Sequence, residues 1–204
     1  MHHFFSMMFS LLAIIGPVSV TSAESRSERS VDRPSRSQLT VTNGMLWGTW
    51  RGRHMCPAGT YAAGFSVKVE RPGGDDTALN GISIYCVDRS RIVQSTQSSG
   101  IGNWGQWTSM VQWCPSGYLT SFQLRVESCQ RDGDDTAANN IRFKCTGGDV
   151  IEELGTGWGN WGDYGEWSPK CEGTGICGIQ TRIEEPQGVF DDTALNDVRM
   201  FCCD

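Results

Sequence analysis

The sequence predicts an all-β domain built from three repeats, and three observations support this fold class. A block of about 57 residues recurs three times after residue 40. Within each block apolar and polar residues alternate, which is the period of a β-strand. The 25 glycines and the short polar connectors leave no room for a long amphipathic helix. We therefore expect about four strands in each repeat.

Residues 1–23 are expected to form a signal peptide. They contain no Asp, Glu, Lys or Arg, and their apolar run, Met7–Ile15, ends at Gly16 and Pro17. Small residues at 21–23 fit cleavage after residue 23. The run is shorter than the roughly 20 residues that a membrane anchor needs. The sequence thus predicts a secreted, extracellular chain without a membrane span.

Residues 24–37 alternate charged residues with serine, and we expect them to form a disordered polar tail because they offer almost no apolar surface to bury. The ordered part is then one domain, 38–204. Its repeats are expected at about 41–97, 98–154 and 155–204. The net charge of −6 and the lack of a basic face outside the tail argue against nucleic-acid binding.

Two strands of each repeat follow from alternating apolar residues. In the first strand these residues are Phe65, Val67 and Val69, then Phe122, Leu124 and Val126, then Ile179, Thr181 and Ile183. In the second they are Ile82, Ile84 and Cys86, then Ile141, Phe143 and Cys145, then Val198, Met200 and Cys202. Three equivalent sets of strands indicate a closed, threefold solid. A β-trefoil and a β-prism both satisfy this description, and periodicity alone does not choose between them.

Nine cysteines, all beyond the signal segment, indicate the disulfide framework of an extracellular protein. Equivalent spacing predicts that each repeat is stapled within itself and that the third carries one extra bridge. The expected bonds are Cys56–Cys86, Cys114–Cys145, Cys171–Cys202 and Cys177–Cys203. Because Cys202 and Cys203 are adjacent, an exchange of their partners remains an alternative. Cys129 is left over, either as a free thiol or for an intermolecular disulfide. There is no CxxC pair, and beyond the signal segment His54 is the single histidine, so no metal site and no cofactor are expected.

An Asp-Asp-Thr-Ala-x-Asn block occurs once in each repeat, and we expect it to hold a turn. The residues concerned are Asp75, Asp76, Thr77, Asp134, Asp135, Thr136, Asp191, Asp192 and Thr193. Asp and Thr side chains bond to nearby backbone N–H groups and stabilise turns. Paired carboxylates also suit acid-base work on a glycosidic bond, but adjacent residues of a strand point to opposite faces. Since the block is repeated three times, turn-locking is the preferred interpretation.

The tryptophans fall into two groups. Trp47, Trp104 and Trp161 each precede a glycine in every repeat, so we expect them to pack in the core or an end layer. The tryptophans without an aromatic counterpart in the other repeats are the better candidates for a surface that stacks on sugar rings. These are Trp113, Trp158 and Trp167.

Acidic residues without counterparts are found in the third repeat. Asp163 and Glu166 lie in sequence near Trp167, as a glycan cleft with carboxylates and a stacking ring would require. A solvated acidic edge gives the same pattern and is preferred. If the protein is an enzyme, the catalytic candidates are Glu127, Glu166 and Glu184, acting as a carboxylate-based glycosyltransferase.

Several motifs together resemble one family. They are Val41-Thr42-Asn43-Gly44, the three Asp-Asp-Thr-Ala blocks, the segment Cys114–Phe122 and the terminal pair of cysteines. From about Val41 to Cys203 the chain resembles the vitelline membrane outer layer protein 1 family. The resemblance implies a β-prism of three Greek-key sheets around a pseudo-threefold axis, with a hydrophobic core between them. Cys129 departs from the family pattern.

The resemblance also implies two classes of function. The first is a secreted structural component of egg coats or mucosal fluids, which associates with extracellular glycans, mucin-type glycoproteins and lysozyme. The second is a transferase that lengthens N-acetylglucosamine oligosaccharides, as proposed for some members. The threefold motifs and the cysteine density favour the non-catalytic, glycan- or glycoprotein-binding class. A single functional site is needed only once, so we look for it where the repeats differ.

Overall fold

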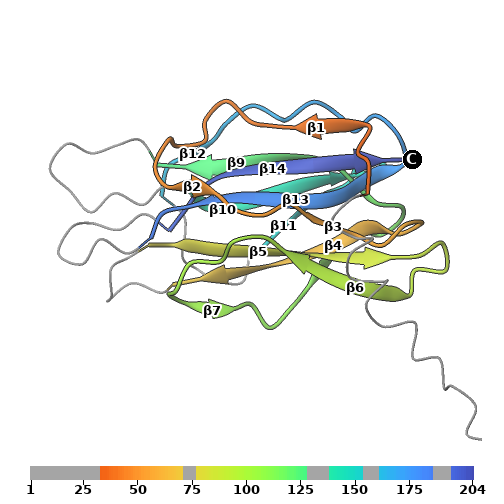
Figure 1. The fold of residues 1–204 in the computed structure, drawn as a ribbon, viewed down its shortest axis with the longest axis horizontal. Coiled ribbons are helices and arrows are strands. Elements are labelled where there is room, and N and C mark those ends of the chain that lie inside the picture. Colours follow the sequence, from red (N-terminus) through yellow and green to blue (C-terminus); the bar gives the residue numbers. More distant parts are fainter. Residues whose placement is uncertain (1–32, 71–76, 128–137, 154–160, 186–193) are drawn as a thin grey trace, which may run out of the picture.

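The computed structural model describes residues 33–70, 77–127, 138–153, 161–185 and 194–204. In these residues the regular elements are all β-strands, which run along the long axis of the molecule (Figure 1). The strands are β1 (Ser37–Leu39), β2 (Thr49–Trp50), β3 (His54–Met55), β4 (Tyr61–Val69), β5 (Leu79–Val87), β6 (Val93–Ser98), β7 (Gln106–Trp107), β8 (Gln112–Trp113), β9 (Leu119–Val126), β10 (Ala138–Cys145), β11 (Val150–Glu152), β12 (Asp163–Tyr164), β13 (Gly175–Ile183) and β14 (Leu195–Cys203).

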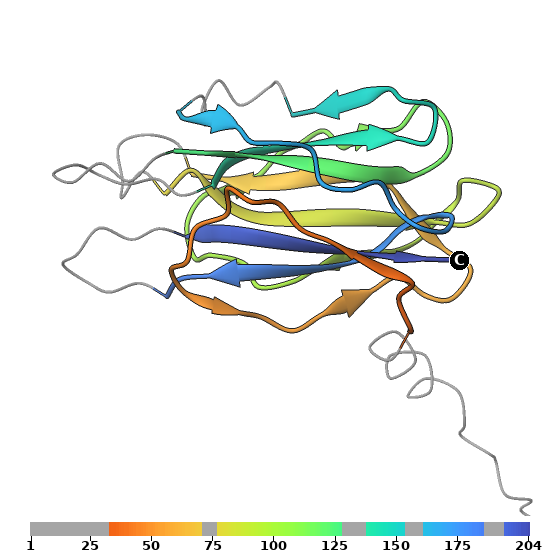
Figure 2. The ribbon, with the colours of Figure 1, turned by 90° about the horizontal axis from the view of Figure 1, so that it is seen from above.

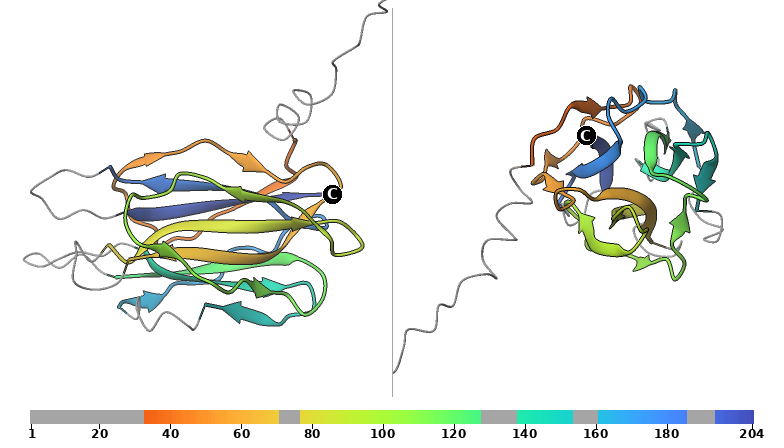
Figure 3. Two further views of the ribbon diagram at one scale, coloured as in Figure 1. Left: turned by 90° about the horizontal axis from the view of Figure 1, so that it is seen from below. Right: turned by 90° about the vertical axis from the view of Figure 1, so that its right-hand side faces the viewer.

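The strands form three antiparallel sheets, which we name after the repeat that supplies their two long strands. Sheet I has the order β6-β5-β4-β7, with β8 also paired to β4. Sheet II has the order β11-β10-β9-β12, and sheet III has the order β1-β14-β13-β2, with β3 also paired to β13. Viewed along the long axis, the three sheets surround a common centre (Figure 3, right). The predicted three-sheet β-prism is confirmed.

The three repeats exchange strands in a cycle. The short strands that open the second repeat, β7 and β8, pair with β4 of sheet I, and β12 of the third repeat pairs with β9 of sheet II. The short strands of the first repeat, β2 and β3, complete sheet III. Strand β1 takes the edge position in sheet III that β6 and β11 take in the other sheets, so the first and last strands lie side by side (Figure 2).

Because of this exchange, three of the four disulfides connect neighbouring sheets. The four bonds are Cys56–Cys86, Cys114–Cys145, Cys171–Cys202 and Cys177–Cys203, the pairs that equivalent spacing predicts. Cys56 extends the strand pairing of sheet III through its N–H, which donates to the Cys177 carbonyl, whereas Cys86 belongs to β5 of sheet I. The same relation joins sheet I to sheet II through Cys114 and sheet II to sheet III through Cys171. Each bond joins two cysteines of the same repeat, as expected, and because each repeat spans two sheets the same bond also links those sheets.

The hydrophobic core lies between the inner faces of the sheets. The alternating residues of the long strands point inward, and Phe65, Phe122 and Phe143 are fully buried. The ring of Phe143 in sheet II lies 4.8 Å from that of Phe65 in sheet I, measured between centroids, and 6.2 Å from that of Phe122. Aromatic rings at this separation add to the stabilisation from buried area. The predicted core faces of the long strands are confirmed.

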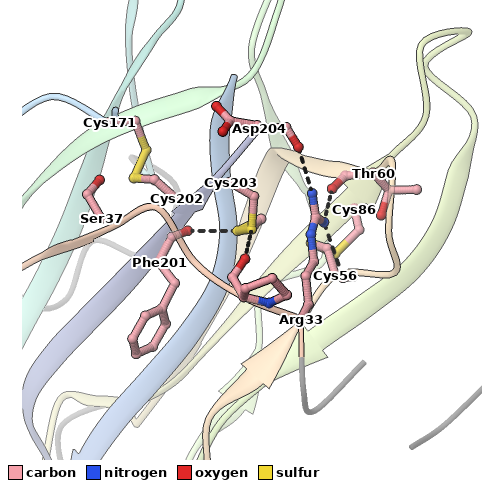
Figure 4. Close-up of a disulfide and its surroundings, with 12 residues drawn as sticks. Arg33, Ser37, Cys56, Thr60, Cys86, Cys171, Phe201, Cys202, Cys203 and Asp204 are labelled. Atoms are coloured by element: carbon pink, nitrogen blue, oxygen red, sulfur yellow. Dashed lines mark hydrogen bonds between the residues drawn. A yellow bond between two sulfur atoms is a disulfide. The ribbon is translucent and has the colours of Figure 1, made fainter. Parts of the chain in front are cut away.

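The end of the expected polar tail is part of the domain. Arg33 is only 8% exposed, and its Nη1 donates to the carbonyls of Cys56 (3.3 Å) and Thr60 (2.7 Å) (Figure 4). It also donates to the Pro57 carbonyl (3.0 Å). Its guanidinium also lies 5.0 Å from the ring centroid of Tyr61. Ser37 begins β1. The prediction of a tail reaching residue 37 is wrong for residues 33–37, because carbonyls distant in sequence converge to accept the arginine's hydrogen bonds.

Candidate functional site

The first Asp-Asp-Thr-Ala-x-Asn block is described from its threonine onward. The Glu70 carboxylate accepts hydrogen bonds from the Thr77 hydroxyl (2.6 Å) and the Thr77 N–H (3.2 Å). The buried Asn80 donates to the Thr77 hydroxyl (2.7 Å), and its side-chain oxygen accepts from the Trp104 N–H (3.2 Å). In this copy Glu70, at the end of β4, is therefore joined through Thr77 to Asn80 at the start of β5.

The asparagine of each block is also a β-bulge residue. Asn80, Asn139 and Asn196 lie opposite a register shift between their two long strands and are buried. A bulge at the same place in three sheets is a conserved geometric device of the repeat rather than a single site. The remaining turn residues lie outside the described residues: Asp75, Asp76, Asp134, Asp135, Thr136, Asp191, Asp192 and Thr193. Turn-locking stays a prediction for them.

Two of the three catalytic candidates occupy this repeated framework. Glu127 and Glu184 follow β9 and β13 as Glu70 follows β4. The Glu184 N–H donates to the Ala194 carbonyl (3.0 Å) as the Glu70 N–H donates to the Ala78 carbonyl (2.9 Å). Since the Glu70 carboxylate accepts hydrogen bonds from Thr77, Glu127 and Glu184 occupy positions suited to the same structural role.

Glu166, the third candidate, is exposed in the segment after β12 of sheet II, whereas Glu184 follows β13 of sheet III. Asp163 is also exposed, at the edge position that β12 takes beside β9. The arrangement is that of a solvated edge, which was the preferred interpretation of these acids.

The repeated tryptophans are on the surface, and their predicted core packing is wrong. Trp47, Trp104 and Trp161 are 56%, 40% and 61% exposed. The following glycine packs into the framework instead. Gly105 has a φ of +78°, and a Cβ added there would collide with the backbone of Val69 in the adjacent β4. Gly48 and Gly162 have the same conformation and the same close approach. The glycine fixes the motif, and the tryptophan before it points outward.

Trp113 and Trp107 lie on the outer face of sheet I. Trp113 pairs with Gly64 of β4, where an added Cβ would come within 2.5 Å of the indole, and its ring lies 5.5 Å from that of Tyr85. Trp107 pairs with Lys68 of the same strand. Gly64 and Lys68 are four residues apart, which separates the two tryptophans by about 13 Å along the strand. Both indoles are partly exposed. Trp107 was not among the candidates from sequence, because its position is also aromatic in the other repeats, as Trp50 and Tyr164.

Trp167 lies on the outer face of sheet II, among cations. Lys144 Nζ is 4.1 Å from its ring centroid, and the Arg142 guanidinium is 5.5 Å from the same centroid. Arg142 also lies 4.0 Å over the ring of Tyr164, whose hydroxyl donates to Glu152 (2.6 Å). Burial, and then the hydrogen bond to Glu152, raise the pKa of the Tyr164 hydroxyl, which therefore remains a donor.

A pocket of about 210 Å³ opens beside Trp167. Its walls include Ser121, Lys144, Thr146, Trp167, Ser168 and Lys170. Asp163 and Glu166, the acids that a glycan cleft at this ring would use, are absent from the lining. Trp113 and Trp167 lie on different sheets, and Trp158 lies outside the described residues. The site thus divides into an indole-bearing face on sheet I and a lysine-bearing pocket on sheet II.

The part of the chain that the structure describes contains neither a candidate membrane-spanning helix nor a metal-binding cluster. No helix there has the length and apolar character to cross a membrane. No group of His, Cys, Asp and Glu within the described ranges is arranged to hold a metal ion.

Comparison with known proteins agrees with the fold. The family model described as vitelline membrane outer layer protein I matches residues 37–204. A mouse protein named vitelline membrane outer layer protein 1 homolog is 50% identical over 173 residues, which cover 82% of this chain and 83% of the relative. The human protein of the same name is 48% identical over 171 residues, which cover 81% of this chain and 82% of the relative. The chain belongs to the vitelline membrane outer layer protein I family.

Proposed function

We propose that the protein is a secreted, non-catalytic component of an extracellular coat that binds glycan or glycoprotein through the outer faces of its sheets. The names of its relatives refer to the outer layer of the vitelline membrane, an extracellular coat. The apolar segment at the start of the chain has the pattern of a signal peptide. The three disulfides that join the sheets in a cycle suit a module that must persist outside the cell.

The observation that carries the binding proposal is the pair of partly exposed indoles on sheet I. Trp107 and Trp113 present flat, amphipathic surfaces of the kind that stack on sugar rings. Each is held in place by the strand beneath it, Trp113 over Gly64 and Trp107 over Gly81. Side chains already ordered in the free protein lose less conformational entropy on binding. A saccharide of several units fits a platform of this length.

The arrangement of the acids argues against glycosyl transfer. A carboxylate pair for glycosidic chemistry needs its two carboxyl groups about 5 to 9.5 Å apart across one space. Glu184 follows a strand of sheet III and Glu166 borders sheet II, while Glu127 and Glu184 occupy the place of the turn-binding Glu70. Binding by tryptophan requires no such pair.

The test is a glycan-array measurement run beside an assay for elongation of N-acetylglucosamine oligomers. We expect wild-type protein to bind glycan without elongation, and the double variant Trp107→Ala/Trp113→Ala to lose most of that binding. Trp47→Ala is the matched control, because it removes an exposed indole outside the sheet I face. Equal binding by the double variant and the wild type would overturn the proposal, as would elongation that depends on Glu127 or Glu184.

A further inference from the structure

The pocket on sheet II arises where the three repeats differ. In sheet I the N–H of Cys114 donates to the carbonyl of Ala63. The next pair of residues along these two strands is Trp113 opposite Gly64. In sheet III the corresponding pair is Met55 opposite Gly178, and an added Cβ on that glycine would collide with the methionine sulfur. In both sheets a large apolar side chain covers a residue without a side chain.

Sheet II has different residues at this place. Cys171 N–H bonds to the Thr120 carbonyl as Cys114 bonds to Ala63, so the equivalent pair is Lys170 opposite Ser121. Both residues line the pocket of about 210 Å³. A flexible, exposed lysine leaves open the space that an indole or a thioether fills in the other sheets. The pocket is therefore a specific property of the second repeat's sheet.

The groups around this pocket favour one kind of ligand. Lys144 and Lys170 supply two ammonium groups, Trp167 supplies a ring, and Ser121 and Thr146 supply hydroxyls. The lining residues include no carboxylate. Lysine binds sulfate and carboxylate groups as a compact point charge. The volume is below the 300 to 1,000 Å³ typical of drug-sized ligands, and suits one ring of a longer chain.

We propose that this pocket binds a single anionic sugar residue, carrying a sulfate or a carboxylate, within a glycan. This inference rests on the proposed glycan-binding function and specifies the ligand class. The anionic group lies between the two lysines, and the sugar ring packs at the edge of Trp167. Because the whole protein carries a net charge of −6, this local positive charge selects the orientation of an anionic chain instead of attracting polyanions in general.

The test compares three matched oligosaccharides with one backbone: neutral, sulfated and carboxylated. We expect the wild type to bind at least one anionic form about tenfold more tightly than the neutral form, as a charge-assisted hydrogen bond predicts. Lys170→Met places the residue of sheet III in the pocket and should remove this preference, while Lys170→Arg should keep it. Arg89→Met is the control, since it removes one positive charge from an exposed turn residue outside the pocket lining.

The outcomes separate this inference from the proposed function. Loss of charge preference in Lys170→Met, with unchanged binding of the neutral oligosaccharide and an unchanged melting temperature, supports both. Tight binding of the neutral form with no preference for either anionic form in the wild type overturns the pocket assignment and leaves the proposed function intact. An acidic peptide that competes as strongly as the anionic oligosaccharide also overturns it. Raised salt should weaken the anionic preference alone.

Discussion

Replacing Arg33 with methionine tests whether the residues before β1 belong to the folded domain. Arg33 donates to the carbonyls of Cys56 (3.3 Å), Pro57 (3.0 Å) and Thr60 (2.7 Å), and almost none of its surface reaches solvent. Each buried carbonyl left without a donor costs about 1 to 3 kcal/mol. Water that enters the space vacated by the guanidinium replaces part of this loss. We expect Arg33→Met to lower the free energy of unfolding by about 2 to 4 kcal/mol.

Urea unfolding with the disulfides intact measures this change, and Arg36→Met is the matched control. Arg36 forms an ion pair with Asp204 (2.8 Å), but both side chains are largely exposed. Exposed pairs contribute little to stability. We therefore expect the control to unfold close to the wild type. If Arg33→Met and Arg36→Met have the same small effect, the inferred role of Arg33 as an anchor of the domain is refuted.

Three further predictions address the staples, a buried acid and the repeated glycine. Replacing both Cys114 and Cys145 with alanine opens a loop of 31 residues, so the free energy of unfolding should fall by about 3 to 4 kcal/mol; a loss below 1 kcal/mol in urea unfolding would contradict this. Burial raises the pKa of Asp197, so its contribution to stability is present below the unfolded pKa of about 3.9 and is lost as pH rises through the folded pKa. Asp197→Asn keeps an acceptor for the Val198 N–H but cannot ionise. Its melting temperature minus that of the wild type should therefore rise between pH 3 and pH 7, and a constant difference would refute the raised pKa. Gly105→Ala forces a side chain into a positive φ and against β4, and calorimetry should show a loss of more than about 1 kcal/mol, whereas Trp104→Ala should lose much less; the reverse order would restore the core interpretation of the tryptophan.

The strands and their inward faces could be predicted because they depend on local pattern. Alternation at Phe65, Val67 and Val69 gives the buried face of β4 directly, and the same period recurs in each repeat. The disulfide pairs could be predicted because equivalent cysteines occupy equivalent places in a threefold solid. Both inferences need only the repeat and the period of the strand.

The exchange of strands between sheets could not be predicted, since the pairing of β2 and β3 with β13 joins residues far apart in the chain. Arg33 was missed for the same reason: its environment in the sequence is that of a solvated tail, and its acceptors come from a distant turn. The error at Trp104 has a different cause. The repeat indicates that the Trp-Gly pair is structural, but it does not show which of the two residues the fold needs. The structure shows that it is Gly105, because of its positive φ and its close approach to the backbone of β4.

The pocket was missed because it depends on what covers a strand rather than on what the strand contains. Lys170 looks unremarkable in sequence, and only the register shows that Trp113 and Met55 stand in its place in the other sheets. Trp167 was singled out in the sequence because it has no aromatic counterpart in the other repeats. The alternative of a glycan cleft would have placed Asp163 and Glu166 beside its ring, and the structure places Lys144 there.

The most direct test of the account is a crystal structure of the protein with the glycan that it binds most tightly. We expect a sugar ring stacked on Trp107 or Trp113 on the outer face of sheet I, with any anionic residue of the glycan beside Lys170 on sheet II. A glycan held instead against Glu127 or Glu184, with none of these three side chains in contact, would contradict the central claim that the repeated glutamates belong to the scaffold and the outer faces of sheets I and II form the site.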